Sequence, residues 1–261
     1  MKALVLAAGL GERVRPLTEK LPKPMLEVGG RPLIHYAFAM LRSAGITQLA
    51  VNVHHLADQI RDGLGDGAAL GLEITYSPEA TLTGTGGPLN ALRDYFGAET
   101  FVLANSDTII DLDLAAMIDF HRTRHAHATI ALYKPDDDRE HEHIEIDDTS
   151  RIRRMRLIKS RQPLVYNDYP SELRGVDESS LDWFMYPGVM ILEPVIFDLI
   201  PRATPWALFS GLLGPMVAND LPVYGFVHRG FFRTVDDLKV YEALRREFAT
   251  AAPKFQHLIF R

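Results

Sequence analysis

The sequence contains no cysteine, which excludes a disulfide framework and any metal site built from thiolates. The absence of cysteine also fits a cytoplasmic location. No run of 18 or more apolar residues occurs, so we expect no transmembrane helix and no membrane partner. The apolar segment 1–10 is too short and ends too rich in glycine to predict a secretory signal.

Positive charge is also scarce. The 28 lysine and arginine residues are outnumbered by 34 aspartate and glutamate residues, which gives a formal net charge of −6. Proteins that bind nucleic acid usually present a basic face, so this balance argues against a nucleic-acid partner. It does not argue against a nucleotide, because a few local cations or a divalent metal suffice for that ligand.

Apolar runs of strand length alternate with helix-like periodicity along most of the chain. The length of 261 residues with 47% hydrophobic residues is enough for one core, and a single domain is expected. Strands are predicted at 2–8, 48–53, 72–76, 101–105, 128–133 and 186–192, and helices at 32–44, 57–63, 86–96, 114–124, 194–200 and 235–251. This alternation predicts an α/β fold with a Rossmann-like, mainly parallel sheet flanked by helices. The pattern is interrupted after about residue 134 by a charged and polar stretch. We interpret that stretch as an insertion over the carboxyl ends of the strands, where ligands of open α/β sheets bind.

The strongest local signal is the segment Leu6–Met25, LAAGLGERVRPLTEKLPKPM. An expected buried strand runs into Gly9 and Gly11, and glycine lets the backbone approach phosphate oxygens closely. Arg13 and Lys23 follow, and such cations suit the phosphates of an NTP. The spacing matches neither a Walker A loop nor a dinucleotide fingerprint, and a purely structural turn is the alternative.

This segment resembles the signature AAGxGxRxxPLTxxxPKPM of the sugar-1-phosphate nucleotidyltransferase family. Within that family it is most similar to small bacterial enzymes that act on N-acetylmuramate 1-phosphate or heptose 1-phosphate. The resemblance implies that Arg13 and Lys23 are catalytic and contact the transferring phosphates, whereas Arg15 lies on the surface. It implies nucleotide contacts by Leu6, Ala7, Ala8, Gly9, Gly11, Glu12, Glu79, Gly86 and Asn105.

Two further segments support the same resemblance. Residues 77–89, SPEATLTGTGGPL, are similar to the family's E-x-x-x-x-GTGG loop, although a solvated loop has a similar composition. The resemblance implies that Glu79 and Gly86 border the nucleotide and that Gly87 and Gly188 contact the sugar. Residues 101–107, FVLANSD, end in Asp107, which on residue type alone is a turn or cap residue or a metal ligand. They resemble the family's N-G-D motif, with Ser106 in place of glycine, which implies that Asp107 binds Mg²⁺ or Mn²⁺.

One segment departs from the family pattern. The family places a second metal carboxylate late in the chain, in a motif like W-x-D-x-G-T, and the corresponding residues here are FRTVDDL. Thr234 then stands at the position of that aspartate, and Asp236 stands at the position of the glycine. Asp236 is either a replacement metal ligand or the N-cap of the last helix.

Other candidates are open from the sequence alone. His54 and His55 either line the sugar pocket or belong to a turn, and Trp183 and Tyr186 either stack on ligand or pack in the core. The remaining histidines match no zinc motif. Further candidates for the sugar phosphate are Glu172, Arg174 and Lys159.

Taken together, the resemblance implies transfer of a nucleotidyl group from an NTP to a sugar 1-phosphate, with release of pyrophosphate. It implies a nucleotide-binding core over 1–133, a mainly sugar-binding part over 134–234, a C-terminal helix over 235–261 and a possible homodimer, all in the nucleotide-diphospho-sugar transferase fold. Two alternatives stay open: a catalytically silent regulator that binds sugar nucleotides, which Thr234 favours, and a transferase acting on a non-sugar phosphate such as phosphocholine.

Overall fold

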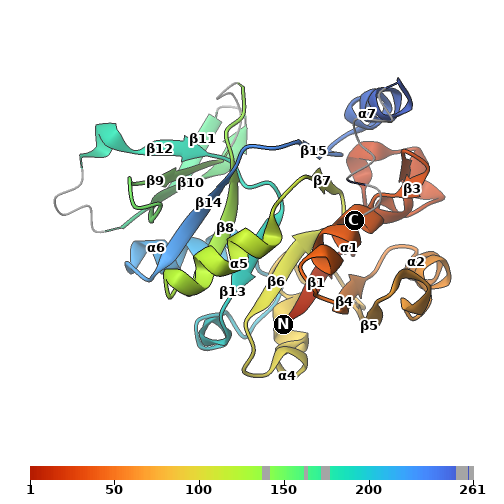
Figure 1. Cartoon of the computed structure of the whole chain (residues 1–261), viewed down its shortest axis with the longest axis horizontal. Helices are drawn as coiled ribbons and strands as arrows, with labels where there is room; N and C mark the ends of the chain where they lie inside the picture. The colour runs from red at the N-terminus through yellow and green to blue at the C-terminus, as the bar shows by residue number, and fades with distance from the viewer. Residues whose placement is uncertain (137–141, 162–163, 172–176, 251–257, 259–261) are drawn as a thin grey trace. The chain divides into compact units, whose positions relative to one another are not determined.

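The structure is a computed structural model that describes residues 1–136, 142–161, 164–171, 177–250 and 258. It forms two compact units, whose elements are labelled in Figure 1. The first unit consists of Met1–Leu82, Phe101–Ala115 and Gly230–Arg261, and the second of Thr83–Thr100 and Ala116–Arg229.

The first unit is built on four parallel strands in the order β6-β1-β4-β5, which lie side by side in Figure 1. These are β1 (Lys2–Leu6), β4 (Gln48–Val53), β5 (Glu73–Pro78) and β6 (Phe101–Asn105). Three of the four strands consist mainly of apolar residues, because both faces of a parallel sheet are covered. In β1, for example, Ala3, Leu4 and Val5 have no exposed surface. The α/β prediction with a mainly parallel sheet is confirmed here.

Helices and short paired strands complete the first unit. Its helices are α1 (Ile34–Ser43), α2 (Ala57–Leu64) and α7 (Leu238–Thr250), with 3₁₀ turns at η1 (Glu12–Val14), η2 (Leu17–Glu19), η3 (Lys23–Met25) and η4 (Ala68–Leu70). Two antiparallel pairs join β2 (Glu27–Val28) to β3 (Arg31–Pro32) and β7 (Thr108–Ile110) to β15 (Phe232–Thr234). One buried cluster includes Val14 of the first turn, Ile109 of β7, Val235 after β15 and Leu244 and Phe248 of α7. This cluster ties the C-terminal helix to the chain around the first turn.

The second unit contains three strands in the order β14-β8-β13. They are β8 (Ala128–Tyr133), β13 (Val189–Leu192) and β14 (Val223–His228), with β14 parallel and β13 antiparallel to β8. Its helical segments are α3 (Pro88–Ala91), α4 (Arg93–Phe96), most of α5 (Leu114–Thr123), η5 (Glu178–Ser180), η6 (Pro194–Asp198), the π-helix η7 (Phe209–Leu213) and α6 (Gly214–Ala218). Two expected helices differ: 86–96 is divided into α3 and α4, and 194–200 is a 3₁₀ helix. Among the described residues, no helix is both long and apolar enough to cross a membrane.

The polar stretch after residue 134 contains a four-stranded antiparallel sheet, visible in Figure 1, whose strands were not predicted from the sequence. Its order is β11-β10-β9-β12, formed by β9 (His143–Ile146), β10 (Ile152–Arg161), β11 (Leu164–Pro170) and β12 (Asp182–Phe184). The register of β10 against β9 shifts between Ile152 and Arg154. This register shift is a β-bulge, and the buried residues of β10 are therefore Ile152, Met155 and Leu157. Because Ile152 and Met155 are three residues apart, the sequence lacks the regular alternation that predicts a strand.

Candidate functional site

The carboxyl ends of the four parallel strands of the first unit place the expected nucleotide-binding segments at one edge. The register sets Leu6 beside Asn105 on one side and beside Asn52 on the other, and Asn52 lies beside Ser77. The glycine-rich turn follows β1, Asp107 follows β6 and Glu79 follows β5. Parallel pairing thus brings together three segments that are distant in the sequence.

In the turn after β1, Thr18 packs against Gly11 and hydrogen-bonds to its carbonyl group. Gly11 has φ of +64°, and a Cβ there would lie 2.8 Å from Cγ2 of the buried Thr18. Thr18 Oγ1 donates a hydrogen bond to Gly11 O at 2.8 Å. Gly9 differs, since in the described part of the chain no heavy atom beyond its own two neighbours lies within 4 Å of the position that its Cβ would take. The fold therefore requires glycine at position 11, whereas the open space beside Gly9 is consistent with a close approach of ligand.

Arg13 and Lys23 each face a carboxylate. Arg13 lies in η1 with its side chain largely exposed, and its Nη2 lies 3.2 Å from Asp236 Oδ1. Lys23 begins η3, is mostly buried and forms an ion pair with Asp107. The structure thus brings the two expected catalytic cations and the two expected metal carboxylates together as two ion pairs.

Ser106 fits the position where the family motif has glycine. Its Oγ donates to Leu6 O at 2.6 Å, and its backbone amide donates to the same carbonyl at 3.3 Å. The serine side chain is therefore turned toward β1, and Asp107 keeps its place at the end of β6.

A chain of hydrogen bonds that the sequence analysis missed joins the first turn to Glu79. The amide of Ala7 donates to Asn52 Oδ1 at 2.8 Å, and Asn52 Nδ2 donates to Glu79 Oε1 at 2.7 Å. Asn52 is buried in β4, where the other buried residues are all apolar. An asparagine among apolar strand residues could have predicted such a hydrogen-bonded link, because buried polar groups need partners.

The rings of His54 and His55 each hydrogen-bond to a backbone carbonyl group. His54 Nδ1 lies 2.7 Å from Glu79 O, and His55 Nε2 lies 2.8 Å from Thr18 O, so each ring donates to a carbonyl. The histidine pair therefore fixes the loop that carries Glu79 and the turn that carries Thr18.

The two adjacent aspartates after β15, Asp236 and Asp237, have different partners. Thr234 lies opposite Thr108 in the β7–β15 pair, and the next amide, Val235 N, donates to Asp107 O at 3.0 Å. Asp237 Oδ1 accepts a hydrogen bond from Val240 N at 2.8 Å, so Asp237 is the cap of α7. Of the two alternatives for Asp236, the N-cap is therefore wrong, and Asp236 faces Arg13.

The GTGG loop belongs to the second unit, and its glycines are needed by the fold. A Cβ on Gly86 would lie 2.2 Å from the ring of Trp206, and one on Gly84 would lie 2.3 Å from Trp206 O. Backbone hydrogen bonds join the same segments, from Gly86 N to Trp206 O at 3.1 Å and from Trp206 N to Thr83 O at 3.1 Å. Gly87 has a similar constraint, with Thr83 2.3 Å from its Cβ position. Packing against Trp206 was not evident from the sequence.

Several expected sugar-site residues also lie in the second unit. Gly188 precedes β13 with φ of +95°, which favours glycine there. Trp183 stacks on His143 with ring centroids 4.3 Å apart, and Tyr186 packs edge-on against Phe209. Outside the described part of the chain lie Glu172, Arg174 and the side chain of Lys159.

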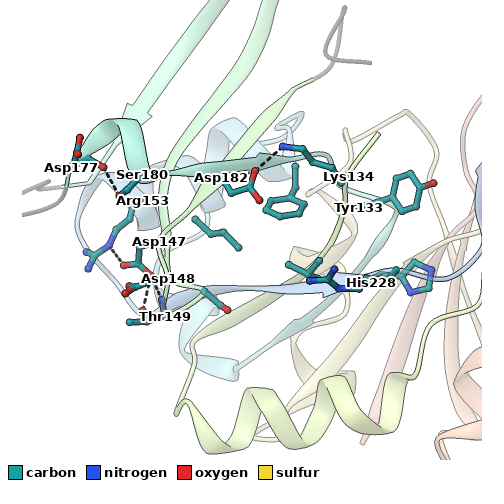
Figure 2. A pocket seen from close by; sticks show the side chains of 15 residues that line it. Tyr133, Lys134, Asp147, Asp148, Thr149, Arg153, Asp177, Ser180, Asp182 and His228 are labelled. Atoms are coloured by element: carbon teal, nitrogen blue, oxygen red, sulfur yellow. Dashed lines mark hydrogen bonds and ion pairs between the residues drawn. The ribbon is translucent and has the colours of Figure 1, made fainter. Parts of the chain in front are cut away.

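A separate pocket of about 960 Å³ lies in the second unit, beside the ends of β8 and β14 (Figure 2). Figure 2 shows that charged groups lining it are paired with one another. Lys134 Nζ lies 2.7 Å from Asp182 Oδ1, and Arg153 Nε lies 2.7 Å from Asp147 Oδ2. In this pocket, as at the edge beside β1 and β6, the cations named here face carboxylates of the protein.

The donor chemistry at that edge fits a divalent cation. Among the described residues, no three His, Asp or Glu side chains gather as a metal site. Mg²⁺, however, is usually held by one or two carboxylates together with substrate phosphates and water. A carboxylate at the end of a strand next to a glycine-rich turn, as Asp107 is, meets that description.

Comparison with known proteins agrees with this geometry. Residues 2–156 match the nucleotidyl transferase family. The chain belongs to that family. The UTP–glucose-1-phosphate uridylyltransferase of Synechocystis sp. is 32% identical over 237 residues, which cover 86% of this chain and 57% of the relative. The N-acetylmuramate alpha-1-phosphate uridylyltransferase of Neisseria meningitidis serogroup B is 47% identical over 118 residues, covering 44% of this chain and 51% of the relative.

The chain thus spans between half and two thirds of the length of these relatives. The structure of HddC from Yersinia pseudotuberculosis superposes with a TM-score of 0.71 at 21% identity, covering 95% of this chain and 99% of that one. The fold is the nucleotide-diphospho-sugar transferase fold, as the sequence predicted.

Proposed function

We propose that this chain transfers a nucleotidyl group from an NTP to a sugar 1-phosphate and releases pyrophosphate. The observation that carries the proposal is the edge of the first unit, where Arg13, Lys23 and Asp107 surround the glycine-rich turn after β1. Both relatives named above bear names that describe this reaction with UTP.

The reaction needs little covalent chemistry from the protein. A phosphate oxygen of the sugar 1-phosphate attacks the α-phosphorus of the NTP, and the bond from that phosphorus to the oxygen of the β-phosphate breaks. The electron pair leaves with pyrophosphate. The attacking oxygen is already an anion, so no general base is required. The protein must align two polyanions and neutralise their repulsion.

Each element of the edge has a part in that alignment. The backbone at Gly9 allows the phosphates to approach, and Arg13 supplies a planar guanidinium that binds phosphate oxygens. Lys23, whose Cβ lies 3.3 Å from the position that a Cβ on Gly11 would take, adds a compact charge. Asp107 is the residue that would hold Mg²⁺ or Mn²⁺, and that cation supplies charge neutralisation on the phosphates when bound. Asn52 and Glu79 connect the turn to the segment after β5, where the resemblance places the nucleotide.

The remaining site assignments are proposed on the resemblance. These are nucleotide contacts by Leu6, Ala7, Ala8, Glu12, Gly86 and Asn105, and sugar contacts by Gly87 and Gly188. We also propose a cytoplasmic location, which the absence of cysteine fits, and a homodimer.

A panel assay tests the proposal. Each of the four NTPs and dTTP is incubated with Mg²⁺ and a set of sugar 1-phosphates that includes glucose and N-acetylmuramate 1-phosphate, and pyrophosphate is measured. We expect release with at least one pair and none when the sugar phosphate is omitted.

Thr234 favours a second candidate, a regulator that binds nucleotide without turnover, because a hydroxyl replaces the carboxylate of the related motif. Tight binding of an NDP-sugar with no pyrophosphate release from any pair would select that candidate.

A further inference from the structure

Two buried valines set the position of Arg13 relative to Asp236. Val14 follows Arg13, Val235 precedes Asp236, and both valines are fully buried in the same cluster of the first unit. The ion pair between Arg13 and Asp236 therefore joins residues far apart in the sequence whose immediate neighbours share one core.

The backbone on either side of Asp236 is also fixed. Val235 N donates to Asp107 O at 3.0 Å, and Tyr241 N donates to Asp237 O at 3.0 Å in the first turn of α7. Asp237 supplies the helix cap, so the side chain of Asp236 has no capping role. Its carboxylate is presented to Arg13 from a constrained backbone.

Arg13 uses one of its donors in this contact. The guanidinium carries five N–H donors, and among the described residues only its Nη2 is engaged, with Asp236 Oδ1. The other donors remain available to a phosphate. The pair is exposed, with 69% of the Arg13 side chain and 49% of the Asp236 side chain accessible, so it adds little to stability. Its effect lies in restricting the conformations of a long, flexible side chain.

We propose that Asp236 is a positioning residue that holds Arg13 over the glycine-rich turn, and that Asp107 is the protein carboxylate for the metal. This inference rests on the proposed function. It assigns a role to a residue that stands two positions beyond the one where the related motif has its aspartate.

The test is a double-mutant cycle on NTP binding. The wild type, Arg13→Ala, Asp236→Ala and the double variant are titrated with UTP by calorimetry, without a sugar phosphate. Because ordering a side chain on binding costs up to about tenfold in affinity, Asp236→Ala should weaken UTP binding by about three- to tenfold. In the Arg13→Ala background the same change should cause no further loss. Asp236→Glu should recover part of the affinity.

A matched control removes the neighbouring charge. Asp237→Asn keeps a capping side chain and removes one negative charge, so it should leave UTP affinity unchanged. Binding of Mn²⁺ to the free protein, followed by electron paramagnetic resonance, separates positioning from metal ligation. Asp236→Ala should keep wild-type Mn²⁺ affinity, and Asp107→Asn should lose it.

Three outcomes would overturn the inference. They are loss of Mn²⁺ binding in Asp236→Ala, an equal loss of UTP affinity with Arg13 absent, and UTP binding by Asp236→Ala as tight as in the wild type. These readouts do not require turnover. If the wild type releases no pyrophosphate from any pair, the proposed function fails while the cycle still decides the role of Asp236.

Discussion

Lys23, a mostly buried cation near the glycine-rich turn, forms an ion pair with Asp107, the carboxylate that follows β6. On the proposed function, in which Asp107 holds the metal, the lysine competes with a divalent cation for that carboxylate. The affinities of the site for metal and for phosphate should then depend on each other.

Removing the lysine should have opposite effects on these two ligands. In Lys23→Met we expect Mn²⁺ affinity of the free protein to rise by about threefold or more, because Asp107 loses a competing cation. The KM for the NTP should rise, because a phosphate-binding charge is lost. Lys20→Met, which removes an exposed lysine from the same loop, is the control and should change neither quantity. A fall in Mn²⁺ affinity in Lys23→Met would contradict the competition.

Gly9→Ala and Gly11→Ala should separate binding from folding. A methyl group at position 9 meets nothing within 4 Å, so thermal stability should be retained while NTP affinity falls. At position 11 the positive φ and the contact with Thr18 should lower the free energy of unfolding by about 1 kcal/mol or more. Thermal melts and NTP titrations of both variants check this. Unchanged NTP binding by a folded Gly9→Ala protein would show that the ligand does not approach there.

The two adjacent aspartates before α7 should differ in their effect on stability. Asp237→Ala removes a helix cap and should lower the free energy of unfolding by roughly 1 kcal/mol. Asp236→Ala removes an exposed ion pair and should lower it by less than about 0.5 kcal/mol. Urea denaturation of the two variants makes the comparison, and equal losses would contradict the assignment of the cap.

His121 should make stability depend on pH. Its ring is buried, with Nδ1 2.8 Å from Thr129 Oγ1 and Nε2 3.0 Å from Glu193 Oε1. Burial lowers the pKa of His121 below its ordinary value of 6.5, despite the opposing effect of Glu193. The unfolded chain then binds the proton more readily than the folded chain, so stability should decline as the pH falls below about 6.5.

The variant His121→Gln should reduce this decline in urea denaturation between pH 7.5 and pH 5.5. His125→Asn is the control, because His125 lies on the surface at φ of +47°, a conformation that asparagine tolerates. An unchanged pH dependence in His121→Gln would remove His121 from the explanation.

The parts of the fold that follow from local patterns could be predicted from the sequence. β1 and β6 are short apolar runs, and the turn after β1 carries its glycines and cations within a few residues. The sheet of β9 to β12 could not be predicted, because the bulge before Arg154 shifts the buried positions of β10 out of alternation.

The site was predicted unevenly for a related reason. Arg13, Lys23 and Asp107 were expected in the site because the segments that carry them resemble the family's motifs, and the structure pairs Lys23 with Asp107 and Arg13 with Asp236. Asn52 was missed because its partners, Ala7 and Glu79, lie on other segments.

Two other features could be identified only from the structure. Asp236 and Asp237 fit the signal for a helix cap equally well, and only the backbone geometry distinguishes them. The packing of Gly86 against Trp206 depends on a contact that no local pattern encodes.

If nucleotidyl transfer takes place at the edge beside β1, removal of the Arg13 guanidinium should abolish most of the activity. Pyrophosphate release is measured for wild type, Arg13→Ala and Arg15→Ala with the best pair of NTP and sugar 1-phosphate. Arg15 is the matched control, since it lies two residues away and is paired only loosely, at 3.8 Å, with Glu12. We expect Arg13→Ala to lower kcat/KM by about 100-fold or more, because an arginine on a transferring phosphoryl group contributes that much, and Arg15→Ala to stay within about threefold of wild type. Folded Arg13→Ala protein with kcat/KM within a few-fold of wild type would contradict this expectation.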